Sequence, residues 1–90
     1  MRRTILWRIM QGTRVRFTKS ARRHRIGKAR ALHVMNTIAP VSVAADDEMR
    51  ERLLWIGPDD RGLELEVVAI VEPDQLLVIH VMPRQFRRRT

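Results

Sequence analysis

Alternation of apolar and polar positions predicts strands in several parts of this chain. Residues 14–17 read Arg-Val-Arg-Phe, a period of two that predicts a half-buried strand with its two apolar residues turned inward. Residues 50–57 alternate in the same way, and residues 63–71 and 76–82 are dense in the Val, Ile and Leu of buried strands. We expect a short N-terminal strand, an edge strand over residues 41–44, and an antiparallel meander further on.

Helical spacing predicts two helices between the first strand and the meander. Ser20 can cap a brief basic helix over residues 21–24, and a second helix is expected over residues 28–37. At 100° per residue, the second helix has one apolar face, formed by Ala31, Leu32, Val34, Met35 and Ile38. His33 points away from that face, so we expect its side chain to be exposed.

These elements predict one small α+β domain, with a short N-terminal strand and two helices packed on a three- to four-stranded antiparallel sheet. Ninety residues are enough for a single core. We interpret residues 1–13 as an N-terminal extension and residues 14–90 as the domain, which ends in a basic tail. Arg8 interrupts the apolar positions of the extension, which argues against a signal peptide. Met10 is an alternative start of the chain.

The turn between the last two strands determines which side chains share a face. Pro73 cannot adopt the positive φ that a type I′ or II′ loop needs at its first position, so we expect a three-residue loop over residues 73–75. Glu64 then lies directly opposite Arg84. The sheet face away from the helices carries Glu64, Glu66, His80 and Arg84. A four-residue loop would instead turn His80 towards the helices.

The distribution of charge along the chain indicates what kind of partner the protein binds. The chain has 18 basic and 10 acidic residues, and none of the acidic residues falls within residues 1–45. Such a basic half suits a polyanion, either RNA or DNA, or an acidic protein that covers it. A basic solubilising surface is the alternative. No apolar run approaches the length of a membrane span, so we expect no membrane partner.

The missing motifs narrow the possible chemistry. The sequence has no cysteine, no glycine-rich phosphate loop, no serine nucleophile elbow and no spacing typical of a metal site. Cleavage of RNA by attack of its own 2′-hydroxyl needs only a base, an acid and cations, and these are present. We interpret the face with His80 and Arg84 as a candidate acid/base site, which Arg52 extends. The alternative is a solvated face with an ordinary ion pair.

Six segments of the sequence resemble a known family. They are residues 14–19, 24–26 (His24-Arg25-Ile26), 28–35, 52–59 (Arg52-Leu-Leu-Trp-Ile-Gly-Pro-Asp), 62–69 and 77–84 (Leu77-Val-Ile-His-Val-Met-Pro-Arg84). The family is the BrnT-like toxins of bacterial type II toxin–antitoxin systems, related in fold to the RelE/ParE ribonuclease toxins. The family pattern has glycine where Arg25 stands here, so we expect a rearranged turn after His24.

The resemblance implies an activity, a location and partners. The implied activity is metal-independent cleavage of mRNA in the cytoplasm, without a cofactor, by a toxin that inhibits growth and is restrained by a cognate antitoxin. Its RNA substrate is free or on the ribosome. Candidate catalytic residues are His80, Arg84, Glu66, Arg52 and His24, and candidate RNA-binding residues are Lys28, Arg87 and Arg88. The alternatives are a non-catalytic module that binds nucleic acid or protein, and a gyrase inhibitor.

Overall fold

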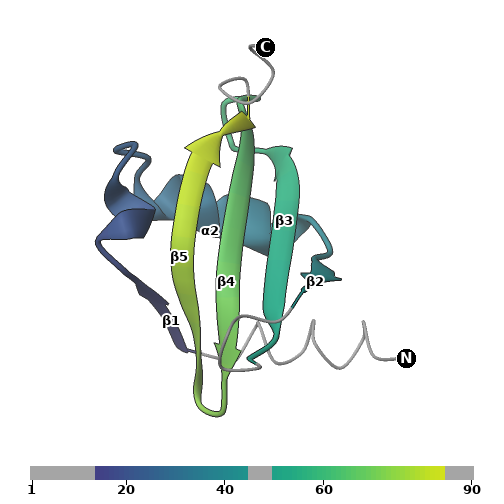
Figure 1. Ribbon diagram of the computed structural model, residues 1–90. Coiled ribbons are helices and arrows are strands. Elements are labelled where there is room, and N and C mark those ends of the chain that lie inside the picture. The colour runs from purple at the N-terminus through teal and green to yellow at the C-terminus, as the bar shows by residue number, and fades with distance from the viewer. Residues whose placement is uncertain (1–13, 45–49, 85–90) are drawn as a thin grey trace.

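The computed structural model describes residues 14–44 and 50–84, which form a single sheet covered on one face (Figure 1). The elements in chain order are β1 (Arg14–Phe17), the 3₁₀ helix η1 (Ser20–Arg22), α2 (Lys28–Thr37), β2 (Val41–Val43), β3 (Arg52–Pro58), β4 (Glu64–Glu72) and β5 (Gln75–Pro83). The strand order is β1-β5-β4-β3-β2, so β1 and β2 form the two edges. No helix in these ranges is long and apolar enough to cross a membrane.

The predicted architecture, two helices on a three- to four-stranded antiparallel sheet, is wrong. The sheet has five strands and is mixed, because β1 pairs in parallel with β5 while the other pairs are antiparallel. Of the described residues, 48% are in strands and 21% in helices. The first expected helix is a single 3₁₀ turn, because four residues without an apolar stripe cannot sustain an α-helix.

The core lies between the sheet and α2, which packs on β3 and β4. The most buried side chains come from both layers: Ala31, Val34 and Met35 of α2, and Leu53, Trp55, Leu65, Val67, Ala69, Leu76, Val78 and Val81 of the sheet. These helix residues belong to the apolar face that the sequence predicts, and His33 is exposed, as expected. The opposite side of the sheet, called here the helix-free face, has no helix on it in the described residues (Figure 1).

The β4–β5 hairpin combines a shorter turn than expected with a bulge. The turn has two residues, Pro73 and Asp74, since Glu72 pairs with Gln75, so the predicted three-residue loop is wrong. Neither turn residue has positive φ, so the turn is not type I′ or II′. A register shift between Val68 and Ala69 then adds one residue to β5 and restores the predicted pairing of Val68 with His80.

The bulge keeps His80 out of the core. Without the shift, the register set by the turn would place His80 opposite Val67, which is fully buried beneath α2. Val81 takes that position instead and is 1% exposed. Burying valine in place of an imidazole removes apolar surface from water and leaves no buried polar ring without a partner, so the hydrophobic pattern selects the bulged register.

A buried ion pair ties α2 to the loop after β3. Asp59 accepts hydrogen bonds from the backbone N–H groups of Arg61 (2.8 Å) and Leu63 (2.9 Å), and from Nε of Arg30 at 2.7 Å. Burial by itself raises the pKa of the Asp59 carboxyl. The hydrogen bonds from Arg30 and the two backbone donors, together with the charge of Arg30, outweigh burial and lower that pKa below its ordinary value.

Candidate nucleic-acid interface

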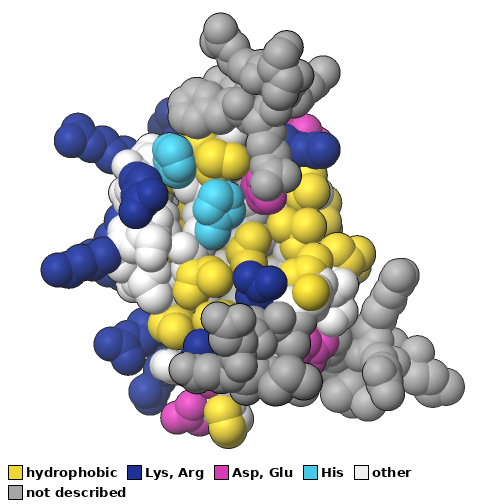
Figure 2. Space-filling view, viewed as in Figure 1, with side chains coloured by type: hydrophobic (Ala, Val, Ile, Leu, Met, Phe, Trp, Pro, Cys, Tyr) yellow, Lys and Arg dark blue, Asp and Glu magenta, His cyan; other side chains and the backbone are white. Residues whose placement is uncertain are grey.

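One edge of the molecule carries a row of cations, called here the basic edge. It consists of Arg14, Arg16, Lys19, Arg22, Arg23, Arg25 and Lys28, which come from β1, from η1 and its flanking residues, and from the start of α2. Figure 2 shows their side chains as dark blue projections along the left side of the view. Within residues 14–44 and 50–84, no carboxylate forms an ion pair with any of them. The basic edge is therefore an exposed positive surface whose cations have no anionic partner in the described part of the chain.

Local backbone geometry gathers part of this charge on one side. Arg16 points away from the core because its neighbours Val15 and Phe17 pack against it. The chain then turns at Thr18, whose Oγ1 accepts the N–H of Ala21 at 3.3 Å. Thr18, rather than the expected Ser20, therefore caps this turn.

Two of the cations are stacked by the 3₁₀ turn, and a third lies over an aromatic ring. Side chains three residues apart eclipse in a 3₁₀ helix, which places Lys19 and Arg22 on the same side. Nζ of Lys28 lies 5.8 Å from the centre of the Phe17 ring, a cation–π contact. Lys28, which the sequence analysis selected for RNA binding, thus belongs to the basic edge.

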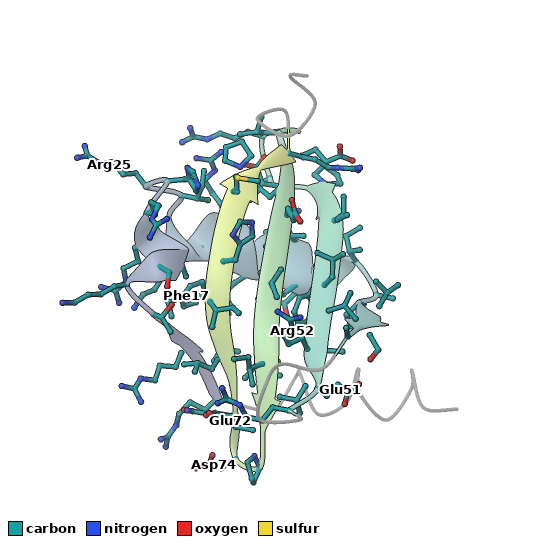
Figure 3. The ribbon with its side chains drawn as sticks, viewed as in Figure 1. Phe17, Arg25, Glu51, Arg52, Glu72 and Asp74 are labelled. Carbon is teal, nitrogen blue, oxygen red and sulfur yellow. The ribbon has the colours of Figure 1, made fainter. Side chains whose placement is uncertain are left out.

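A hollow of about 450 Å³ opens between η1 and the β1–β5 pair. Its lining consists of Arg16, Phe17, Thr18, Lys19, Arg22, Glu72, Gln75 and Leu77. Figure 3 shows Glu72 near the β4–β5 turn and Phe17 further up, towards η1. Glu72 is held from two sides: its Oε1 accepts Nε2 of Gln75 at 2.6 Å, and its Oε2 accepts Nη1 of Arg50 at 3.4 Å. The cations and the carboxylate therefore occupy different ends of one hollow, called here the β1–β5 hollow.

The turn after η1 has the backbone conformation that glycine favours, although an arginine occupies it. Arg25 has φ 57°, in the left-handed region, and its N–H donates to the carbonyl of Arg22 at 3.0 Å. The Arg25 side chain points out from the molecule (Figure 3). His24 precedes it and is half-buried. Since η1 packs on β5, His24 lies on the side of the molecule where β5 carries His80.

The helix-free face brings together some of the predicted site residues. His80 pairs with Val68, and Glu66 pairs with Met82 one row further along, so both lie on this face as expected. Glu64 and Arg84 form the predicted cross-strand pair, with Oε1 and Nη1 3.8 Å apart. Glu66 is only 6% exposed. Histidine side chains gather on the upper part of this face, over and beside β5 (Figure 2).

Arg52 is not part of that group. It pairs with Ile70, six residues along β4 from Glu64, which corresponds to about 20 Å of strand. Its Nε donates to the carbonyl of Ala44 at 2.9 Å, and its side chain lies on the lower half of the helix-free face (Figure 3). Arg52 therefore shares the helix-free face with Arg84, but the two residues lie at opposite ends of the sheet.

The remaining predicted site residues, Arg87 and Arg88, lie outside the described residues. In the part of the chain that the structure describes, no three histidine, aspartate or glutamate side chains are grouped so that they could hold a metal. Thr18, Glu72 and Gln75 line the hollow but carry no signal in the sequence. The hollow depends on the parallel pairing of β1 with β5, for which no local pattern gives a signal.

Comparison with known proteins gives no relative: no family model matches the sequence, and neither the curated proteins nor the solved structures contain a significant match.

Proposed function

We propose that this protein binds single-stranded RNA along the basic edge and cleaves it at His80, as the toxin of a toxin–antitoxin pair. The observation that carries the proposal is the basic edge itself. Its seven cations have no carboxylate partner among the described residues, and β1 and η1 lie next to β5, the strand that carries His80. Cations on such an edge can bind successive phosphates of a strand by neutralising their charge. A cytoplasmic location, where mRNA is available, and an acidic antitoxin that covers the basic edge are parts of the same proposal.

The proposed reaction uses the nucleophile that RNA carries. His80 takes the proton of a 2′-hydroxyl, the 2′-oxygen bonds to the adjacent phosphorus, and the bond to the 5′-oxygen breaks. The leaving 5′-oxygen needs a proton, and His24, in the turn next to η1, is the candidate donor. The products are a 2′,3′-cyclic phosphate and a 5′-hydroxyl. A cation from the basic edge stabilises the additional negative charge on phosphorus in the transition state.

The test is cleavage of end-labelled single-stranded RNA by the purified protein in the presence of EDTA. We expect products that end in a 2′,3′-cyclic phosphate, and we expect His80→Ala to abolish them while RNA binding persists. His33→Ala is the matched control, because His33 is an exposed histidine on α2, away from the helix-free face. Equal cleavage by wild type and His80→Ala would contradict the assignment of His80.

A second candidate is a non-catalytic RNA-binding protein, and the state of the acidic residues favours it. The guanidinium of Arg84 faces the carboxylate of Glu64, with Nη1 and Oε1 3.8 Å apart, and Glu66 is only 6% exposed, so Arg84 already has an anionic partner and Glu66 is buried. This alternative predicts that RNA is bound with a steep salt dependence and recovered intact. Intact RNA together with normal bacterial growth during expression of the protein would select it over the ribonuclease.

A further inference from the structure

The β1–β5 hollow has two chemically different ends. At the η1 end, Lys19 and Arg22 stand on one side of the 3₁₀ turn, close to Arg16. At the other end, Glu72 and Gln75 flank the β4–β5 turn. Arg14 lies opposite Gln75 at one end, and the N–H of Thr18 donates to the carbonyl of Val78 at the other. These two points of the β1 backbone are four residues apart, or about 13 Å.

A continuous phosphate backbone does not match this arrangement. The cationic end suits a phosphate group, since a guanidinium can hold two of its oxygens at once. At the other end, the carboxylate of Glu72, paired with Arg50, offers only hydrogen-bond acceptors, so it calls for N–H donors rather than a phosphate. Its side chain is 23% exposed, so it is accessible from the hollow. A ligand that fits carries an anionic group at one end and hydrogen-bond donors at the other. A single nucleotide has this form, with its phosphate as the anion and its base as the donor.

The acceptor geometry of Glu72 distinguishes among the bases. Each carboxylate oxygen offers about two lone-pair positions, and Gln75 and Arg50 use one position on each oxygen. One acceptor position thus stays open on each of two adjacent oxygens. Guanine presents two neighbouring donors on its Watson–Crick edge, N1–H and N2–H. Adenine, cytosine and uracil each place an acceptor beside their donor, which a carboxylate repels.

We propose that the β1–β5 hollow binds one guanine nucleotide of an RNA strand, with its phosphate at Arg16, Lys19 and Arg22 and its base at Glu72. The hollow, at about 450 Å³, is within the size range of small-molecule sites. Leu77 and Phe17 supply apolar lining between the two ends. The proposal rests on the proposed binding of RNA and adds a base preference to it.

The position of the hollow also connects it to the proposed cleavage site. Leu77 lines the hollow. His80 lies three residues further along β5, just past the bulge at Ile79, and is on the helix-free face. A strand whose guanine occupies the hollow therefore continues towards His80. Cleavage is expected at a bond next to guanine rather than at random positions.

The test is calorimetric titration of the full chain with 5′-GMP, 5′-AMP, 5′-CMP, 5′-UMP and inorganic phosphate. We expect GMP to bind about tenfold more tightly than the other nucleotides, since two hydrogen bonds to a charged acceptor distinguish it. Glu72→Gln should remove this preference and leave phosphate binding unchanged. The double variant Lys19→Gln with Arg22→Gln should weaken all nucleotides and phosphate alike. Asp60→Asn, a change of an exposed carboxylate in the loop between β3 and β4, is the matched control and should behave as wild type.

A second arm uses RNA hexamers with and without a single guanine. Tighter binding of the guanine-containing hexamer, lost in Glu72→Gln, supports an RNA ligand. Equal binding of both hexamers, or equal binding of the four nucleotides, overturns the guanine site and leaves the proposed RNA binding intact. Failure of wild type to bind either hexamer overturns the proposed function as well. Circular dichroism of each variant identifies any that fails to fold. Glu72→Asp, whose carboxylate is one methylene further from the base, then replaces Glu72→Gln and should likewise lower the preference for guanine.

Discussion

Arg25 shows how a single residue can retain an unfavourable backbone conformation. A left-handed φ of 57° costs an L-residue roughly 1 kcal/mol, and glycine is free of that cost. The strain persists because the N–H of Arg25 bonds to Arg22 and because the chain must reverse here to start α2. The turn thus positions His24 at the expense of local stability.

Replacing this arginine with glycine should stabilise the protein. We expect Arg25→Gly to raise the free energy of unfolding by about 0.5–1 kcal/mol, since the relief of strain exceeds the entropy that glycine adds to the unfolded chain. Arg23→Gly is the control: Arg23 has φ −56°, an ordinary helical value, so glycine there should be destabilising. Urea denaturation of both variants measures the difference. A loss of stability in Arg25→Gly would contradict the strain.

Asp59 gives the protein an acid-dependent stability. Its pKa in the folded state is lowered below the value of about 3.9 that it has when unfolded, so its contribution is complete above that value. The contribution is lost as the pH falls through the folded pKa. We expect the free energy of unfolding to decrease between about pH 5 and pH 2. Asp60→Asn, at an exposed neighbour, should leave the profile unchanged, and a flat wild-type profile would refute the role of Asp59.

The partner of Asp59 provides a second measurement. Arg30→Met keeps the apolar stem and removes the charge, so the buried carboxylate loses its side-chain donor. We expect a loss of about 2 kcal/mol at pH 7 and a weaker decrease in stability towards acid. A variant as stable as wild type at pH 7 would show that the two backbone donors suffice.

At the scale of elements, the close approach of α2 to the sheet depends on a glycine. A Cβ added at Gly57 would lie 2.5 Å from Cγ1 of Ile38, the residue that ends α2. We expect Gly57→Ala to cost about 2 kcal/mol through overpacking. In an Ile38→Ala background, where the obstructing atoms are missing, the same change should cost much less. Additive losses in this double-mutant cycle would mean that the contact is not the cause.

The sequence predicted local structure better than strand assembly. The inward faces of β1 and α2 and the exposure of His33 follow from periodicity, because apolar burial determines which side of an element faces the core. The opposition of Glu64 and Arg84 is predicted from a three-residue loop that the structure does not have, and the bulge restores it. The pairing of β1 with β5 joins segments far apart in the chain, so no local pattern contains it. The two-residue turn was missed because the bulge at Ile79 compensates for it further along β5.

At the scale of the whole molecule, the basic edge faces away from most of the acidic groups in the described residues. Three of these acidic groups, Glu64, Glu66 and Asp59, lie on β4 or in the loop before it. In the sheet, β5 lies between β4 and the edge strand β1, so these groups are separated from β1. In the described residues, the positive charge is therefore concentrated at the basic edge rather than averaged over the surface. RNA should approach from the β1 side and bind more weakly as salt is added.

The salt dependence tests how many cations contact phosphates. Each phosphate contact on a single strand contributes about −0.7 to the slope of log K against log salt concentration. We expect Lys19→Gln with Arg22→Gln to make the slope about 1.4 units less steep. Lysine and arginine changes outside the basic edge, such as Arg61→Gln in the loop before β4, should leave it unchanged. An unchanged slope in the double variant would exclude both residues from RNA contact.

The parallel pairing of β1 with β5 also has a consequence for the order of folding. The β3–β4–β5 meander is built from contacts between strands that are neighbours in sequence. β1 instead pairs with a strand about 60 residues away, so the entropic cost of closing the loop between them is larger. β1 is therefore expected to dock last, on a meander that is already formed. The hollow exists only when β1 is paired with β5, so a ligand that contacts both strands would also stabilise their pairing. The binding surface would then be the last part of the protein to fold.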